Sequence, residues 1–365
     1  MNSIGISMIN SCIPQKWIDV EDILKCWSNS NLGFLQNAIG IENRRVIGAD
    51  EDAVTLSVSA INKIQADSKD LFDSFDGLFV GSNTMPELFR ANAIQIKEML
   101  TDRENVMSED IQASENSSIL GLINAYTAIS SNMMSAAIVV GSDVLGRHIA
   151  PGSLREYYAG SAASAALISR RNVIATIEGI STISSDFPEI GRPEDERFFR
   201  NFTSLNSGIV RQGMIKHCVA AVKEQLKKSG HQIENYKHVI LPEFTMNSTK
   251  ALANVLKVTP TQLKSSLYFK NLGDIGNAGP LLGLQMALEN SDPDDDILLV
   301  SYGHSAQAVC MELKVTSKVK GFKHNHTEMK KDIEEHTKDF KVDYATMLKF
   351  EDKLVQTNQA FGSFL

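Results

Sequence analysis

The sequence is poor in cysteine, and its few cysteines are not arranged as pairs. The four residues are Cys12, Cys26, Cys218 and Cys310. They show neither the CxxC spacing typical of redox and zinc sites nor the density of a disulfide scaffold. No apolar run reaches the roughly 18 residues that a membrane helix needs. The start of the chain also lacks the basic region and cleavage site of a signal peptide. We therefore expect a cytoplasmic protein with no metal site and no membrane segment.

Concentrated positive charge is also absent. The net charge is −8, and no basic stretch is interleaved with aromatic residues, so nucleic acid is not an expected partner. The chain has 365 residues, of which 43% are hydrophobic. This length and composition suffice for a large core and predict two domains or one duplicated unit.

Short apolar runs rich in Val and Ile alternate with longer helical patterns. Such alternation predicts an α/β fold, here with largely parallel sheets. The predicted strands are Ile4–Ile9, Leu78–Gly81, Ala136–Gly141, Ala165–Ser169, Val173–Ile180, His238–Leu241, Ile297–Tyr302 and Ala308–Val315. The predicted helices are Thr55–Ile64, Ser117–Ser130, Arg211–Lys228, Thr249–Leu256 and Ala278–Glu289.

The two halves of the chain repeat one pattern. In each half a helix leads to a buried strand, a loop and a second strand, which indicates duplication. We predict an N-terminal half at residues 1–171, a C-terminal half at 172–320 and an extension at 321–365. Two segments are predicted to be solvated: a surface excursion at 188–202, and a charged linker or helix at 316–341.

Cysteine is also missing between Asp110 and Leu122, where a strand is predicted to run into a helix. A side chain at such a junction points into the helix N-terminus, where backbone N–H groups and the helix dipole favour an anion. The same environment lowers the pKa of a thiol and produces a reactive thiolate. In this chain the junction carries Glu115.

Several stretches, taken in order, resemble the ketoacyl synthase III and archaeal-type hydroxymethylglutaryl-CoA synthase family. They are Gly40–Arg45, Asp76–Thr84, Ala136–Asp143, Tyr158–Leu167, Asn271–Pro280, Leu298–Gly303 and Val342–Phe350. The resemblance spans nearly the whole chain. It is strongest to the cysteine-free, ketosynthase-like subunits of phloroglucinol C-acetyltransferase complexes. It implies a thiolase-like, duplicated, five-layer αβαβα fold.

The same resemblance locates the catalytic positions of the family. Members use a cysteine nucleophile, an oxyanion donor and a group that handles protons. The cysteine position falls on Glu115 and the histidine position on Pro242, or on Glu243 if the alignment slips by one residue. Neither residue replaces an imidazole.

Two further positions are also changed. The asparagine position falls on Asp274, which as a carboxylate accepts hydrogen bonds and would repel an oxyanion. Asn277 is an alternative occupant of that role. The acid/base glutamate of the synthases falls on Asn83, which transfers no proton. All four catalytic positions are therefore degenerate.

The residues near Glu115 leave three possibilities open. Ser114 or Glu115 could carry an acyl group, the pocket could be filled and inactive, or an anionic Glu115 could block it. Acyl transfer to Glu115 would give a mixed anhydride no lower in energy than the thioester. Ser114 needs a general base within hydrogen-bond reach, and the sequence shows none. His304 follows a predicted strand and is a candidate for a polar group that survives at the site.

We therefore predict a ketosynthase-like subunit that is catalytically silent on its own and belongs to an oligomeric complex. The resemblance implies a thiolase-like catalytic partner, a small OB-fold subunit, and C-acylation or carbon–carbon bond formation on a small metabolite. CoA thioesters are the expected ligands, and no cofactor is expected to be covalently bound. The alternative is an independent acyl-CoA-dependent acyltransferase, decarboxylase or hydrolase with non-cysteine chemistry.

Overall fold

The computed structural model describes residues 3–67, 72, 74–187, 189–202, 209–304, 307–325, 329–334 and 338–354. Within these residues nine strands form one sheet in the order β11-β12-β13-β8-β1-β7-β6-β4-β5. Its strands are β1 (Gly5–Cys12), β4 (Gly77–Gly81), β5 (Met107–Ile111), β6 (Ala136–Val144), β7 (Ser161–Ser169), β8 (Ala175–Ser184), β11 (His238–Ile240), β12 (Asp296–Gly303) and β13 (Gln307–Val315). Two short hairpin-like pairs join β2 (Trp17–Asp19) to β3 (Asn43–Arg45) and β9 (Ile190–Gly191) to β10 (Arg200–Asn201).

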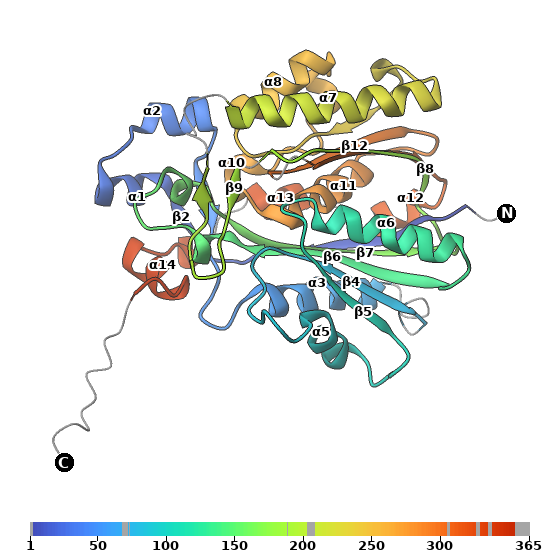
Figure 1. Ribbon diagram of the computed structural model, residues 1–365, viewed down its shortest axis with the longest axis horizontal. Coiled ribbons are helices and arrows are strands. Elements are labelled where there is room, and N and C mark those ends of the chain that lie inside the picture. Colours follow the sequence, from blue (N-terminus) through green and yellow to red (C-terminus); the bar gives the residue numbers. More distant parts are fainter. Residues whose placement is uncertain are drawn as a thin grey trace.

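The sheet has two portions, and the helices form three layers (Figure 1). One layer lies between the two portions, and one lies on the outer side of each. The larger helices are α3 (Ala53–Asp67), α5 (Asn92–Leu100), α6 (Ser117–Ser130), α7 (Ile209–Ser229), α8 (Met246–Leu256) and α11 (Gly279–Glu289). The shorter ones are α1 (Val20–Trp27), α2 (Leu32–Phe34), α9 (Pro260–Leu263), α10 (Phe269–Leu272), α12 (Val319–Asn325), α13 (Met329–Glu334) and α14 (Tyr344–Phe350). Helix α7 covers β8 and β13, α3 covers β1 and β7, and α6 and α11 lie between the two portions. The arrangement confirms the predicted αβαβα layers.

The central helix α11 shows why the sequence produces a middle layer. Its sequence, GPLLGLQMALE, is apolar on nearly every side, and all but two of its eleven residues are buried. A helix that is apolar all round must be covered on all faces. Contacts with β1 and β7 on one side and with β11 and β12 on the other provide that cover.

The expectation of largely parallel sheets is wrong. Antiparallel pairing joins β1 to β7, β1 to β8, β6 to β7, β8 to β13 and β12 to β13. Parallel pairing is found for β4 with β5, β4 with β6, and β11 with β12. Continuous apolar runs indicate strands buried on both faces. Here the helix layers bury both faces whichever way the strands run.

The strand order repeats between the two halves of the sheet. The sequence β1-β7-β6-β4 in one half corresponds to β8-β13-β12-β11 in the other. The middle-layer helices α6 and α11 immediately precede β6 and β12. The halves meet where β1 pairs with β8, with Gly5 opposite Thr176 and Ile6 opposite Ala175. The boundary predicted after residue 171 falls in the connection between β7 and β8.

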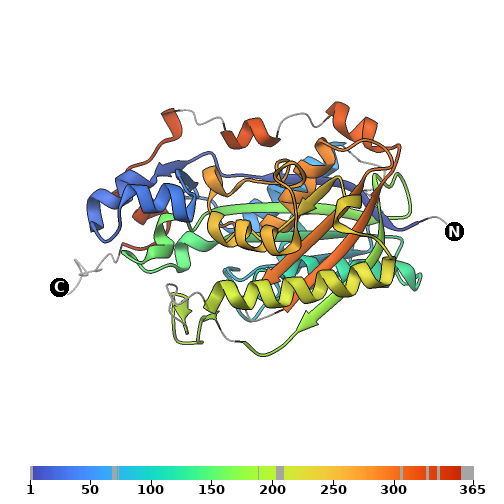
Figure 2. The same ribbon diagram turned by 90° about the horizontal axis from the view of Figure 1, so that it is seen from above.

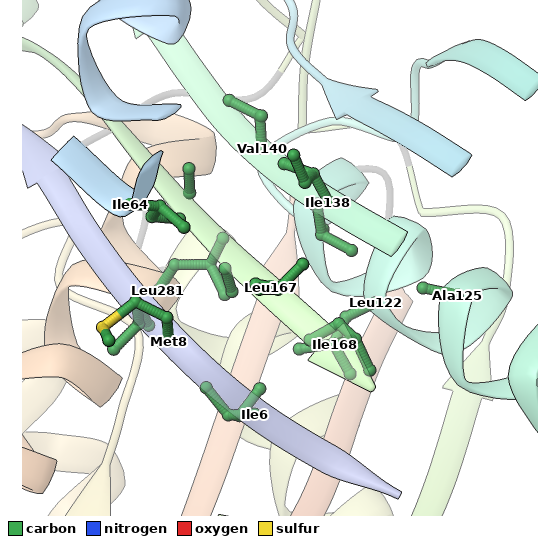
Figure 3. Close-up of a cluster of buried hydrophobic side chains, with 14 of the residues drawn as sticks. Ile6, Met8, Ile64, Leu122, Ala125, Ile138, Val140, Leu167, Ile168 and Leu281 are labelled. Atoms are coloured by element: carbon green, nitrogen blue, oxygen red, sulfur yellow. The ribbon is translucent and has the colours of Figure 1, made fainter. Parts of the chain in front are cut away.

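The main core fills the space between the central strands and their flanking helices (Figure 3). Ile6 and Met8 of β1 and Leu167 and Ile168 of β7 meet side chains from α3, α6 and α11. Each fully buried aliphatic side chain contributes about 1.5–3 kcal/mol. This core fixes the relative positions of the strand ends and helix starts that form the site.

The C-terminal segment follows one side of the molecule and returns to the N-terminal helices (Figure 2). The prediction that residues 316–341 are solvated is only partly right, because Phe322, Met329 and Ile333 are buried. Residues 326–328, 335–337 and 355–365 of the predicted extension lie outside the described residues. None of the helices in the described part of the chain is long and apolar enough to cross a membrane.

Candidate functional site

Glu115 lies at the turn between β5 and α6, as the sequence predicted, and only 6% of its surface is exposed. One carboxylate oxygen, Oε1, lies 2.9 Å from Nδ1 of His304. The other, Oε2, accepts a hydrogen bond of 3.1 Å from the backbone N–H of His304. The preceding strand is less buried than expected, because β5 forms the edge of the sheet. The structure thus brings the candidate His304 directly against Glu115.

The two side chains form a buried ion pair. Burial by itself would raise the pKa of Glu115, but the charge and contact of His304, together with Arg155 and Ser114, hold this pKa below its usual range. Burial would lower the pKa of His304, and the Glu115 carboxylate outweighs it, so the pKa of His304 is raised. The pair therefore favours the carboxylate form of Glu115 and shifts His304 toward its protonated form.

Ser114 has a possible base, contrary to the sequence prediction. Its hydroxyl donates a hydrogen bond of 2.6 Å to Oε2 of Glu115. Its backbone is in the left-handed region, with φ of 55°, a conformation often found at sites under functional constraint. The lowered pKa of Glu115 nevertheless makes this carboxylate a weak base, and efficient proton transfer needs a pKa near the working pH. The hydrogen bond to Glu115 therefore does not by itself make the Ser114 hydroxyl a nucleophile.

Asp274 is paired with an arginine that the sequence did not single out. Nη2 of Arg155 lies 3.2 Å from Oδ2 of Asp274, and both side chains are buried. Oδ1 of Asp274 accepts a hydrogen bond of 3.0 Å from the N–H of Gly276. Burial raises the pKa of Asp274, and Arg155 opposes that rise. Asp274 is thus engaged with neighbouring groups and offers no hydrogen-bond donor to an oxyanion.

The predicted histidine position lies just beyond β11. The carbonyl of Pro242 accepts a hydrogen bond of 2.8 Å from the hydroxyl of Thr249. The next residue, Glu243, is buried, and its carboxyl group accepts hydrogen bonds from the N–H groups of Tyr268 at 3.2 Å and Phe269 at 3.1 Å. Burial raises the pKa of Glu243 to about 8, against the effect of these hydrogen bonds. Neither residue performs the role of an imidazole.

Both asparagines contact Asp143, Asn83 through its backbone and Asn277 through its backbone and side chain. The backbone N–H of Asn83 donates to Asp143 at 2.8 Å. Asn277 is fully buried, and its Oδ1 accepts from the N–H of Ser117 at 2.7 Å, at the start of α6. Its Nδ2 donates to Asp143 at 2.9 Å and to the carbonyl of Ser114 at 3.0 Å. All its groups are occupied, so Asn277 is not available as an oxyanion donor.

A further buried carboxyl group, that of Glu189, lies close enough to His304 to interact with its charge. Glu189 is fully buried, and its Oε2 accepts a hydrogen bond of 2.8 Å from the hydroxyl of Tyr302. Burial raises its pKa to about 7, opposed by the charge of His304. The prediction of a surface excursion from residue 188 is therefore wrong at Glu189. No sequence signal marks this residue, because a charged segment is normally solvated.

The cavity that remains at this site is very small. Its volume is about 20 Å³, and Glu115, Pro242, Glu243, Asp274 and Tyr302 are among its lining residues. A space of this size holds about one water molecule. The ring of Phe244 lies 4.1 Å from the ring of His304 and fills the adjoining space. No acyl group fits beside Glu115 in this conformation.

A much larger pocket of about 960 Å³ lies next to this cavity. It is bordered by α8, α9, α10 and α13 and by the segment 36–42. Its inner wall is mainly apolar, and it includes Val258, Leu263 and Phe269, while Lys250 and Lys264 also border it. Among the described residues, no group of three His, Cys, Asp or Glu side chains is arranged to hold a metal ion.

The layered architecture and the placement of the site at the start of α6 define a thiolase-like α/β fold. Comparison with solved structures supports this assignment. An HMG-CoA synthase complexed with CoA superimposes with a TM-score of 0.82 and 18% identity, covering 97% of this chain and 92% of that chain. The 3-oxoacyl-(acyl carrier protein) synthase III of Pseudomonas aeruginosa PAO1 gives a TM-score of 0.76 and 16% identity, covering 86% and 98%.

Sequence comparison extends over the same length. The hydroxymethylglutaryl-CoA synthase of Archaeoglobus fulgidus is 26% identical over 354 residues, which is 96% of this chain and 99% of the relative. That of Methanosphaera stadtmanae is 26% identical over 355 residues, with the same coverage. No family model matches the chain. The chain is therefore similar to hydroxymethylglutaryl-CoA synthases from end to end, and its fold is that of this group and of ketoacyl synthase III.

Proposed function

We propose that this chain is a catalytically silent, ketoacyl synthase III-like subunit of a C-acyltransferase or carbon–carbon bond-forming complex. Its site lacks the group that would accept an acyl chain. The single observation that carries this proposal is the buried pair of Glu115 and His304. It lies at the strand-to-helix junction on which the resemblance places the family's cysteine.

Three physical reasons support a silent site. A carboxylate with a lowered pKa is a poor nucleophile, and its product with a thioester would be an anhydride with no energetic advantage. Asp274 and Pro242 supply no donor for an oxyanion, whose stabilisation is usually the largest contribution to acyl transfer. The cavity of about 20 Å³ leaves no room for the acyl group.

The larger pocket is the place where a CoA thioester would bind. One solved relative is complexed with CoA and another with 3-hydroxy-3-methylglutaryl coenzyme A. The pocket of about 960 Å³ has the volume of a typical ligand site, and its apolar wall suits the pantetheine arm. Lys250 and Lys264 would attract the phosphates. In this proposal the chain holds or presents a thioester without reacting with it.

The catalytic partner would be a thiolase-like chain that carries the cysteine, with a small OB-fold subunit between them. The support is the resemblance to the cysteine-free subunits of phloroglucinol C-acetyltransferase complexes. A solved relative, the HMG synthase of the curacin pathway in complex with holo donor-ACP, binds another protein through the same fold. It superimposes with a TM-score of 0.84 at 15% identity and covers 96% of this chain and 88% of that chain.

The test is to incubate the isolated chain with acetyl-CoA and malonyl-CoA and to measure its intact mass and the release of CoA. We expect no covalent adduct and no CoA release above the buffer rate. Addition of a cysteine-bearing, thiolase-like partner encoded with this chain should give acyl transfer that remains in Ser114→Ala, which leaves the Glu115–His304 pair in place. An acyl adduct on the isolated chain would overturn the proposal.

One observation favours the alternative of an independent enzyme with serine chemistry, namely the 2.6 Å hydrogen bond from the Ser114 hydroxyl to Glu115. Such an enzyme would be an acyl-CoA hydrolase, decarboxylase or acyltransferase. In that case CoA release by the isolated chain would disappear in Ser114→Ala. The two functions are thus separated by one substitution in the same assay.

A further inference from the structure

Two residues separate the small cavity at Glu115 from the large pocket beside it. Among the described residues, Glu243 and Tyr268 are the ones that border both spaces. On one side lies the cavity of about 20 Å³ that contains the Glu115 carboxylate. On the other side lies the pocket of about 960 Å³. These two side chains therefore lie at the boundary between the large pocket and the small cavity.

Glu243 is fixed in this position by the backbone opposite it. Its carboxyl group accepts hydrogen bonds from the N–H of Tyr268 and the N–H of Phe269, at the start of α10. These are among the N–H groups that a helix start leaves without an internal partner. The carboxyl group therefore bridges from the end of β11 to α10, and only 7% of Glu243 is exposed.

Tyr268 is fixed as well. It is buried, and its hydroxyl lies against Gly279 at the start of α11, where a Cβ atom would come within 2.2 Å of the hydroxyl oxygen. The ring cannot move in that direction without displacing α11. Of the two side chains, Glu243 is the one that can be shortened without disturbing the contact with α11, and its loss leaves the N–H groups of Tyr268 and Phe269 to water that enters the opened passage.

We propose that Glu243 is the barrier that prevents a thioester arm in the large pocket from reaching residue 115. The inference rests on the proposed function in one respect, that the large pocket takes a CoA thioester. It adds that the silence of the chain has two separate causes: the missing nucleophile at position 115 and the closed passage at position 243. Introducing a nucleophile at position 115 alone, or opening the passage at position 243 alone, is therefore not enough for rapid acylation.

The proposal can be tested by restoring both. In Glu115→Cys the new thiol lies at the start of α6, near His304 and Arg155, an environment that favours the thiolate. The thiolate would attack the carbonyl of acetyl-CoA and form a new carbon–sulfur bond. The bond between the acetyl group and CoA would break, and CoA would leave as a thiolate that takes up a proton. The product is an S-acetylated chain and free CoA.

The experiment compares Glu115→Cys, Glu243→Ala and the double variant by intact mass and peptide mapping after incubation with acetyl-CoA. We expect acetylation at residue 115 in the double variant and at least about tenfold slower acetylation in Glu115→Cys alone, a difference of about 1.4 kcal/mol in barrier. Glu42→Ala in the Glu115→Cys background is the matched control, because Glu42 borders only the large pocket. Equal rates in Glu115→Cys with and without Glu243→Ala would overturn the proposal.

A second measurement keeps the barrier testable if the large pocket binds something other than CoA. Iodoacetamide is small and needs no binding site, so its rate of reaction with the thiol introduced by Glu115→Cys reports only the open passage. This rate should rise at least about tenfold in the double variant and stay low when Glu243 is replaced by Gln, which keeps the shape of the side chain. If the double variant is alkylated no faster than Glu115→Cys alone, Glu243 is not a barrier. A raised alkylation rate without acetylation, together with no CoA binding by calorimetry, would instead refute the assignment of the large pocket to CoA.

Discussion

Nδ1 of His304 lies 2.9 Å from Oε1 of Glu115, across a separation of 189 residues in the chain. Glu115 precedes α6 in the N-terminal half, and His304 follows β12 in the C-terminal half. The pair therefore joins the two halves at the centre of the molecule. A charge in a buried pair costs much more to leave alone than the pair gains by forming. The contact consequently makes position 115 part of the stability of the fold.

Breaking this pair should destabilise the protein strongly. In Glu115→Gln the imidazole of His304 loses its carboxylate partner while remaining buried, and we expect a loss of about 3–5 kcal/mol in the free energy of unfolding. The measurement is urea denaturation followed by circular dichroism at pH 6. His304→Gln should cost a similar amount.

The double variant Glu115→Gln with His304→Gln should recover part of that loss, because no charge is then left unpaired. The control is Glu87→Gln, which removes an exposed ion pair with Arg90 at 4.0 Å; such pairs contribute about 0–1 kcal/mol. Additive losses in the double variant would mean that Glu115 and His304 do not interact.

The protein should be most stable at mildly acidic pH and lose stability as pH rises from about 4.3, the unfolded pKa of a glutamate, to about 8, the raised pKa of Glu243. Burial raises the pKa of Glu243 to about 8 and that of Glu189 to about 7. A raised pKa means that the folded chain keeps a proton which the unfolded chain has released. The stabilising contribution of each carboxyl group is therefore complete below the pKa that the group has in the unfolded chain. It falls as pH rises toward the pKa in the folded chain, by up to about 1.4 kcal/mol per pH unit for each group. The raised pKa of His304 acts in the same direction.

Glu115 determines the loss of folding stability at low pH. Its pKa is lowered in the folded chain, so its contribution is present above the unfolded value of about 4.3 and is lost as pH falls below it. Denaturation curves at pH 3 and 4.5 test the acidic limit, and curves at pH 5.5, 7 and 8 test the loss of stability at higher pH. Glu243→Gln should flatten the loss between pH 6 and 8, whereas Glu42→Gln should not. Stability that increases from pH 6 to 8 would refute the assignment.

The C-terminal segment should be essential because it buries an arginine. Arg44 is fully buried and pairs with Glu351 at 2.5 Å, just after α14, and Lys353 lies 2.8 Å from the same carboxylate. Glu351→Gln leaves the buried Arg44 without its carboxylate partner, whereas Lys353 keeps Glu156 at 3.2 Å. The substitution should cost about 3–5 kcal/mol. Asp352→Asn is the matched control, because Asp352 is the next residue and its side chain is 80% exposed. Thermal unfolding of the two variants measures the difference, and equal melting temperatures would contradict this role.

Much of the fold could be predicted from local patterns. Helix α6 has the bounds Ser117–Ser130 given by its apolar periodicity, and β6, β12 and β13 contain the predicted runs. Strand β5 was expected only as a strand running into α6, without bounds and as a buried strand, because its sequence MSEDI has neither alternation nor a continuous apolar run. It forms the sheet edge, where one neighbour is missing and the demand for apolar residues is lower.

The site was predicted only in part. The position of Glu115 follows from the strand-to-helix pattern, and His304 was recognised as a loop residue after a strand. Their contact could not be predicted, because a pair separated by 189 residues leaves no periodic signal. Glu189 lies in a segment predicted to be solvated and Arg155 in a loop for which burial was not predicted, and only the tertiary fold buries them. The two cavities divided by Glu243 likewise depend on how the helices pack.

The contact between the two halves at the site also requires glycine at position 141. A Cβ atom on Gly141 of β6 would lie 2.0 Å from the backbone oxygen of Asn277, the residue that caps α6. Backbone cannot yield as a flexible side chain does, so Gly141→Ala must separate β6 from the segment that carries Asp274 and Asn277. We expect a loss of about 3 kcal/mol or more in the free energy of unfolding, the upper end of the range for overpacking.

The matched control is Gly321→Ala in α12, where nothing lies within 4 Å of the added Cβ atom. Alanine is the better helix former by about 0.5–1 kcal/mol, so this variant should be slightly more stable than the wild type. Urea denaturation of both variants distinguishes these outcomes: if Gly141→Ala is tolerated as well as Gly321→Ala, the two halves are not in direct backbone contact at the site.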